Sequence, residues 1–105
     1  MTPWRAGLAV AGLGLGACTR PAPRPHVVEI RGFAFAPATL ELPAGDTVVW
    51  INHDVVPHTA TREGGEWDSG SLGAEQVWRL VVTGKDSQPY YCAFHPTMRG
   101  VLMVR

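Results

Sequence analysis

The stretch YYCAFHPTMRG, Tyr90–Gly100, places three side chains that can bind a metal within seven residues. Cys92, His95 and Met98 follow one another at intervals of three on a segment that reads as a loop between two strands, so all three can turn toward one point. Thiolate and thioether are soft sulfur donors and imidazole is intermediate, a combination that selects copper over magnesium, calcium or manganese. The spacing therefore predicts a metal site with copper as its cofactor.

A further ligand is expected from His58, in the segment Asp54–Thr59. This segment is rich in turn residues and follows an apolar run that ends at Ile51. Two His, one Cys and a weak axial Met form the ligand set of electron-transfer copper sites. Taken one at a time, a Met is usually a core residue, a His a surface residue and a Cys an inert buried side chain. The interpretation as a metal site depends on all four occurring together.

These residues also resemble a known family. The segment Asn52–His58, followed by the Cys-x-x-His-x-x-Met motif of Cys92–Met98, resembles the cupredoxins, the type 1 blue copper proteins. Among amicyanin- and plastocyanin-like members, the short loop from Cys to Met is most similar to that of the amicyanins. The resemblance covers about residues 30–104. It implies a cupredoxin fold and one copper ion with four ligands: His58, Cys92, His95 and Met98.

Two neighbours of the expected ligands depart from the family pattern. Thr59 stands where the family usually has Asn, and Phe94 stands where amicyanin has Pro. A prolyl residue has no N–H, so Phe94 offers a backbone donor for the sulfur of Cys92 that amicyanin lacks. We expect both residues to lie next to the ligands. If the loop geometry points the Phe94 N–H at the Cys92 sulfur, it should raise the reduction potential; the alternative is that Phe94 merely covers the site.

Length and charge indicate one small domain. The 105 residues carry 9 basic and 9 acidic side chains without a run of like charge, so nothing indicates a nucleic-acid-binding surface. The only two cysteines are Cys18 and Cys92, and a disulfide between them would consume the thiol that the copper set needs. The site should hold a single copper ion, since a dinuclear centre would want a second Cys in the same loop.

The N-terminus predicts an exported, lipid-anchored protein. Residues 1–17 combine Arg5 with an uncharged run rich in Ala, Gly and Leu that is typical of a signal peptide and too short to span a membrane. Leu15–Cys18 resembles the lipobox of bacterial lipoproteins, in which the Cys is lipidated and becomes the first residue. The alternative is an ordinary cleaved signal with an incidental Cys. We expect anchoring at Cys18 on the periplasmic or cell-surface side of a bacterial membrane.

Residues 18–26 are expected to form a tether and residues 27–105 the copper domain. Alternate prolines in the tether disfavour helix and favour extended polyproline geometry. From residue 27 on, β-branched and aromatic runs such as Thr39–Leu42 and Thr47–Ile51 alternate with turns rich in Gly, Asp and Ser. About seven or eight strands at this spacing predict an all-β, antiparallel Greek-key sandwich or barrel.

The expected ligand set favours electron transfer over catalysis. Four protein ligands leave no open position for a substrate, whereas catalytic metals keep one. We therefore expect a membrane-tethered monomer that carries single electrons between a redox donor and an acceptor, and no enzyme. The family resemblance implies that the electron passes at the exposed edge of His95 to a redox protein such as a c-type cytochrome. The same resemblance implies an apolar docking face that consists of Pro57, Phe94 and Pro96.

Two other functions stay open. A copper delivery or buffering protein would favour an exposed, exchangeable site with extra Met or His, and the sequence has no Met-rich or His-rich tract. A reductase or oxidase that uses the copper as a relay would need a second metal site, which His26 and His53 on separate segments do not supply.

Overall fold

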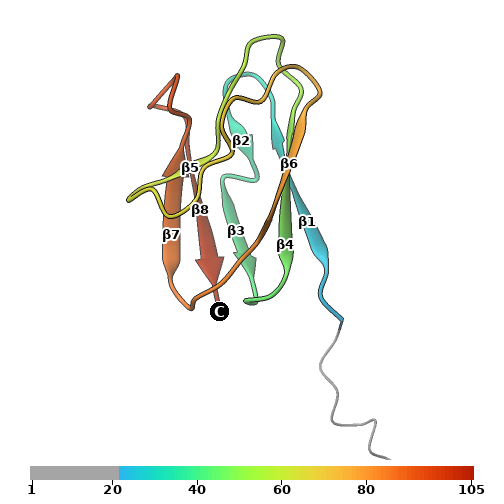
Figure 1. The fold of residues 1–105 in the computed structure, drawn as a ribbon, viewed down its shortest axis with the longest axis vertical. Coiled ribbons are helices and arrows are strands. Elements are labelled where there is room, and N and C mark those ends of the chain that lie inside the picture. The colour runs from blue at the N-terminus through green and yellow to red at the C-terminus, as the bar shows by residue number, and fades with distance from the viewer. Residues whose placement is uncertain (1–21) are drawn as a thin grey trace, which may run out of the picture.

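Two four-stranded β-sheets form the part of the chain that the computed structural model describes, residues 22–105 (Figure 1). The strands are β1 (Pro25–Ile30), β2 (Phe35–Ala36), β3 (Thr39–Leu42), β4 (Thr47–Asn52), β5 (Thr61–Arg62), β6 (Val77–Val81), β7 (Ser87–Tyr91) and β8 (Arg99–Val104). One sheet has the order β2-β1-β4-β6 and the other the order β3-β8-β7-β5. Among these residues we find no helical segment that could span a bilayer. The predicted all-β sandwich is confirmed.

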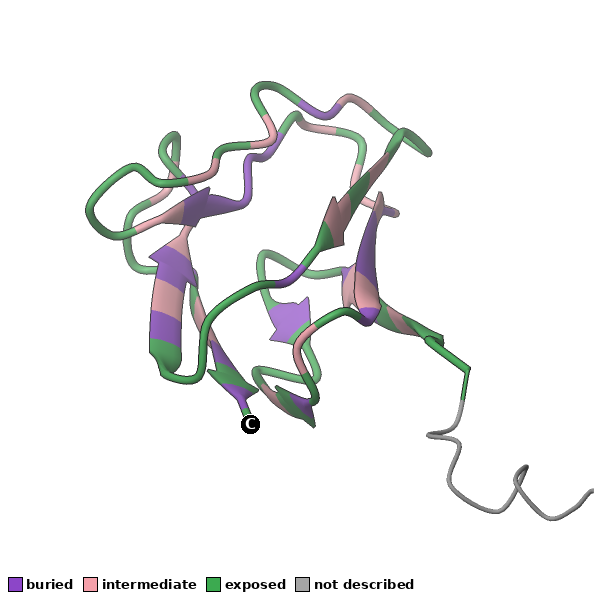
Figure 2. Cartoon of the chain, turned by 60° about the horizontal axis from the view of Figure 1, so that its bottom comes forward, coloured by how far each residue is buried: buried purple, intermediate pink, exposed green. Residues whose placement is uncertain are grey.

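Strand β4 lies inside its sheet and supplies much of the core. Its residues Trp50 and Asn52 are fully buried, as expected where β-branched and aromatic residues follow one another in a central strand. In the other sheet, Leu102 and Val104 of β8 are buried while Met103 between them is exposed. This alternation is that of a strand with one face on the core. Figure 2 shows buried residues on strands of both sheets.

Two strand pairs are parallel, which the antiparallel sandwich expected from the sequence did not include. β1 pairs with β4 in parallel, and β3 pairs with β8 in parallel. The chain passes from β1 through β2 to the second sheet for β3 and then returns, so β4 enters beside β1 in the same direction. The loops that follow β1, β4 and β7 consequently lie at one end of the sandwich, the upper end in Figure 1. The described chain begins at the opposite end.

The first sheet begins at Pro25, before the boundary at residue 27 that the sequence predicted. Pro25 and His26 pair with the start of β4, and His26 Nε2 lies 2.9 Å from Asp46 Oδ2. Pro is tolerated as the first residue of a strand. The strand therefore starts at the last of the alternate prolines, two residues before the expected start of the copper domain. The predicted signal peptide and residues 18–21 of the tether, Cys18 among them, lie outside the described residues.

An aromatic cluster fills the core between the sheets. The ring centroid of Trp50 lies 5.5 Å from that of Trp67, 5.3 Å from that of Trp78 and 5.4 Å from that of Tyr90. Tyr90 faces Gly100 across the β7–β8 pair. A Cβ atom at Gly100 would lie 2.5 Å from Tyr90 Cζ, so the Tyr90 ring needs a glycine there. This contact fixes the two strands that flank the Cys-to-Met loop.

We therefore expect Gly100→Ala to lower the free energy of unfolding by about 1–3 kcal/mol, the usual cost of forcing extra volume into a packed interior. Chemical denaturation of the copper-free protein measures this change. The matched control is Gly73→Ala, because a Cβ there would meet only the Gln76 side chain, Oε1 at 3.4 Å and Cδ at 3.8 Å. Equal stability of the two variants would contradict the packing argument.

Candidate metal centre

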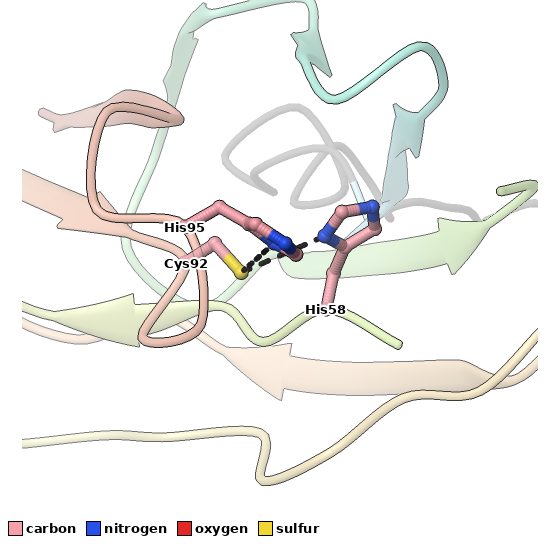
Figure 3. A group of neighbouring side chains, drawn as sticks. All are labelled: His58, Cys92 and His95. Carbon is pink, nitrogen blue, oxygen red and sulfur yellow. Dashed lines mark hydrogen bonds between the residues drawn. The ribbon is translucent and has the colours of Figure 1, made fainter. Parts of the chain in front are cut away.

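Two loops at the same end of the sandwich bring His58, Cys92 and His95 together. His58 lies between β4 and β5, and the other two lie between β7 and β8. The candidate ligand atoms of the three side chains all lie within 4.8 Å of one another. Cys92 Sγ lies 3.6 Å from His58 Nδ1 and 3.7 Å from His95 Nδ1. Figure 3 shows the three side chains converging, with dashed lines from the sulfur to both rings.

These distances suit three ligands of one metal ion. Bonds of about 2.3 Å from a metal to sulfur and about 2.0 Å to nitrogen at a tetrahedral angle separate the two ligand atoms by about 3.5 Å. The observed separations of 3.6 Å and 3.7 Å are close to this value. A thiol and two imidazoles are donors for copper or zinc rather than for magnesium or calcium. The residues present therefore fit the copper ion expected from the sequence.

The Cys-to-Met loop owes its shape to two successive turns. The N–H of His95 donates to the carbonyl of Cys92 (3.1 Å), and the N–H of Met98 donates to the carbonyl of His95 (2.9 Å). The N–H of Cys92 donates to the carbonyl of Met98 (3.1 Å), which closes the loop. Met98 is buried and packs in the same core cluster as Cys92. Three of the four expected ligands thus lie close enough to share one metal ion, and ligation by these residues and by Met98 stays a prediction.

A carboxylate orients the buried ligand His58. The side chain of His58 is fully buried, and its Nε2 lies 2.9 Å from Asp54 Oδ2. A hydrogen bond from Nε2–H to this carboxylate keeps the proton on Nε2 and leaves the Nδ1 lone pair free on the side of Cys92. Burial raises the pKa of Asp54, but hydrogen bonds from two backbone N–H groups and from His58 outweigh it and hold the pKa below its ordinary value.

The buried side chain of Asn52 shapes the segment that carries His58. Its Nδ2 donates to the carbonyls of Val56 (2.9 Å) and Leu72 (2.8 Å), and its Oδ1 accepts from the N–H of Asp54 (2.8 Å). Asp54 was not among the residues expected at the site. A carboxylate four residues before a predicted His ligand, inside a turn, is the signal that could have identified it.

Thr59 joins the two ligand loops. Its N–H lies 3.4 Å from Cys92 Sγ and donates to it, and its hydroxyl accepts from the N–H of Ala93 at 2.7 Å. The hydroxyl also pairs with that of Thr61 at 2.8 Å. Thr59 is thus in direct contact with the predicted ligand Cys92.

The surroundings of Phe94 bear on whether its N–H bonds the sulfur of Cys92. In the part of the chain that is described, the backbone N–H that donates to Cys92 Sγ is that of Thr59, and Phe94 makes no hydrogen bond to the sulfur. The turn closes instead through the N–H of His95 on the carbonyl of Cys92. The Phe94 side chain is half exposed. Phe94 directly precedes His95 in the sequence, and Pro57 and Pro96, the other residues of the expected docking face, are also exposed.

The sequence is similar to amicyanins. Amicyanin from Paracoccus denitrificans is 32% identical over 83 residues, which make up 74% of this chain and 63% of that protein. Amicyanin from Paracoccus versutus is 29% identical over the same shares. The chain therefore matches 63% of the length of these curated relatives. No protein-family profile matches the sequence.

The fold is similar to solved cupredoxin structures. A reduced amicyanin variant with a Pro-to-Phe substitution has a TM-score of 0.68 and 34% identity, over 75% of this chain and 80% of that one. A purple cupredoxin from Nitrosopumilus maritimus has a TM-score of 0.70 and 29% identity, over 75% of this chain and 98% of that one.

The bridge formed by Thr59 leads to a prediction about stability. Thr59→Val keeps the shape of the side chain but removes the acceptor of the Ala93 N–H, so we expect a loss of about 1–3 kcal/mol in the free energy of unfolding. Thr59→Ser keeps the hydroxyl and removes one methyl group, which should cost about 0.8 kcal/mol. Denaturation of both copper-free variants tests this. A Val variant at least as stable as the Ser variant would show that the hydroxyl does not join the loops.

Proposed function

The chain belongs to the cupredoxins, the type 1 blue copper proteins, close to amicyanin, and we propose that it carries single electrons between two redox proteins. The observation that carries this proposal is the convergence of one thiol and two imidazole Nδ1 atoms in a mostly buried site. In the proposal, His58, Cys92, His95 and Met98 hold one copper ion, which supplies reversible exchange of one electron between Cu(II) and Cu(I).

The residues around the site keep the ligands in one arrangement. Asp54 fixes the ring of His58, and the N–H of Thr59 supplies a hydrogen bond to the sulfur of Cys92. Cys92 and His58 are both fully buried, so water has no access to these two donors. A site that is held in one geometry needs little rearrangement when an electron enters or leaves. With four protein ligands it also offers no open position for a substrate, so we propose a carrier and no enzyme.

The exposed edge of the site suits brief contact with a partner. His95 is the one partly exposed member of the clustered donors, and its neighbours in sequence, Phe94 and Pro96, are exposed apolar residues. Small apolar contact areas are typical of weak electron-transfer encounters. We propose that redox proteins, with a c-type cytochrome as one candidate acceptor, dock on Pro57, Phe94 and Pro96, which are all exposed. The protein would act as a monomer.

The copper delivery alternative has less support. Delivery requires an exchangeable site, whereas His58 and Cys92 are inaccessible to solvent in this fold.

We further propose export and lipid anchoring through Cys18, for which the sequence motif is the support. The arrangement of the domain agrees with such an anchor. β1 begins at the end of the sandwich opposite the metal centre, so a tether before Pro25 would leave His95 facing away from the membrane.

We expect copper-loaded protein to absorb intensely in the visible range, because the Cys92 thiolate donates charge to Cu(II), and to show reversible one-electron voltammetry. Cys92→Ser should abolish the absorption, and the matched variant Cys18→Ala should retain it. A colourless Cu(II) complex of the unmodified protein would contradict the proposed centre. A coloured complex without reversible cycling would favour copper delivery.

Cys18→Ala should release the protein from membranes, because acyl chains rather than the fold would supply the anchor. Membrane fractionation of cells that express the variant or the unmodified protein measures the share of each that stays with the membranes. Persistent membrane association of a copper-loaded variant would mean that Cys18 is not the anchor.

A further inference from the structure

A third loop also reaches the metal centre. Phe33 lies between β1 and β2, and its ring centroid lies 5.1 Å from that of His58 and 4.9 Å from that of His95. The ring planes cross at 83° and 79°, which is an edge-to-face arrangement. The two imidazoles themselves lie 5.1 Å apart at 65°. These three rings, which we call the ring trio, come from three different loops, and each contacts the other two.

One carboxylate fastens Phe33 to the ligand His58. Asp54 Oδ1 accepts from the N–H of Gly32 at 2.8 Å, and Oδ2 accepts from the N–H of Phe33 at 2.9 Å. The same Oδ2 lies 2.9 Å from His58 Nε2. The side chain of Asp54 is only 13% exposed, although Gly32 and Phe33 themselves are exposed. The turn that carries Phe33 and the ring of His58 are therefore held by the same side chain.

The backbone of this turn is held in an unfavourable conformation. Gly32 has a φ of 61° and Phe33 a φ of 60°. Left-handed backbone suits glycine but is disfavoured for a bulky side chain such as that of Phe33. Two successive N–H groups in such a turn form a natural binding site for a carboxylate, which Asp54 occupies. The hydrogen bonds to Asp54 thus offset the cost of turning the Phe33 ring toward the imidazoles.

His95 depends on this ring more than His58 does. The far nitrogen of His58 is held by Asp54. For His95, the hydrogen-bond contact found within residues 22–105 joins its Nδ1 to the sulfur of Cys92. The orientation of the His95 ring therefore rests on its ring contacts with Phe33 and His58.

We propose that Phe33, held by Asp54, is a positioning residue that keeps His58 and His95 directed at Cys92 and slows the loss of copper. The inference rests on the copper centre of the proposed function and adds a residue outside the ligand motif. Its basis is the ring trio together with the shared carboxylate. Phe33 acts through the ligands and does not bind the metal.

Phe94 provides a matched control. Its side chain is 50% exposed, the same fraction as that of Phe33, and it is the sequence neighbour of His95. Among the ring pairs of the described residues, however, the ring of Phe94 contacts neither imidazole. Truncating each Phe to Ala therefore removes a similar exposed ring, and the two variants differ in the contact with the imidazoles.

The first measurement is the rate at which copper-loaded, full-length protein gives up Cu(I) to an excess of a chelator. Loss of one edge-to-face contact changes an equilibrium constant a few-fold, and Phe33 makes two such contacts with the imidazoles. We therefore expect Phe33→Ala to release copper about tenfold faster than the unmodified protein. Phe33→Tyr keeps the ring and should restore the slow rate. Phe94→Ala should change the rate by less than Phe33→Ala does. Equal rates for the two Ala variants would overturn the proposal.

The second measurement uses copper-free protein. Proton NMR should show contacts between the Phe33 ring and both imidazoles, and Asp54→Asn should weaken those contacts while circular dichroism shows an intact fold. Unchanged ring contacts in Asp54→Asn would overturn the role of Asp54. This measurement needs no copper. If the protein fails to bind copper, that result contradicts the proposed function, and the NMR measurement still tests the ring trio.

Discussion

The bridge between Thr59 and the end of β7 holds the functional end of this protein together. The chain crosses from one sheet to the other between β4 and β5, and Thr59 fixes that crossing by accepting the N–H of Ala93 and donating to the sulfur of Cys92. Asn52 fixes the start of the same crossing through three hydrogen bonds of its buried side chain. A fully satisfied buried polar network of this kind specifies one arrangement, because any displacement leaves buried groups without partners. The distance between His58 and Cys92 follows from it.

The parts of the structure that depend on neighbours in sequence could be predicted. The motif of Cys92, His95 and Met98 lies on one loop, and successive turns with hydrogen bonds between residues three apart bring these positions together. Strands such as β3 and β4 were visible as alternating or β-branched runs, because side chains in a strand point to opposite faces in turn. His58 was found because its residue type was required by the other three.

The remaining features depend on contacts between distant segments. β2 and β5 have two residues each, too few to show a period, and the parallel pairings of β1 and β3 follow from how the chain changes sheets. Phe33 could not be recognised as a neighbour of the ligands, because its contact requires a left-handed backbone that a bulky residue rarely adopts. The hydrogen bond to the Cys92 sulfur is a further example: its donor is the N–H of Thr59, from another loop, and not that of Phe94, which is close to Cys92 in the sequence.

The two imidazoles of the centre are unequal, and this inequality limits how the protein can be used. His58 is fully enclosed with its far nitrogen bonded to Asp54, whereas His95 reaches the surface. In the proposed function, a donor and an acceptor would compete for the same small area around His95 and could not be bound at the same time. Each turnover would then comprise two separate encounters with a dissociation between them. An excess of either partner would block the other, so throughput would depend on how quickly each complex falls apart rather than on how tightly it forms.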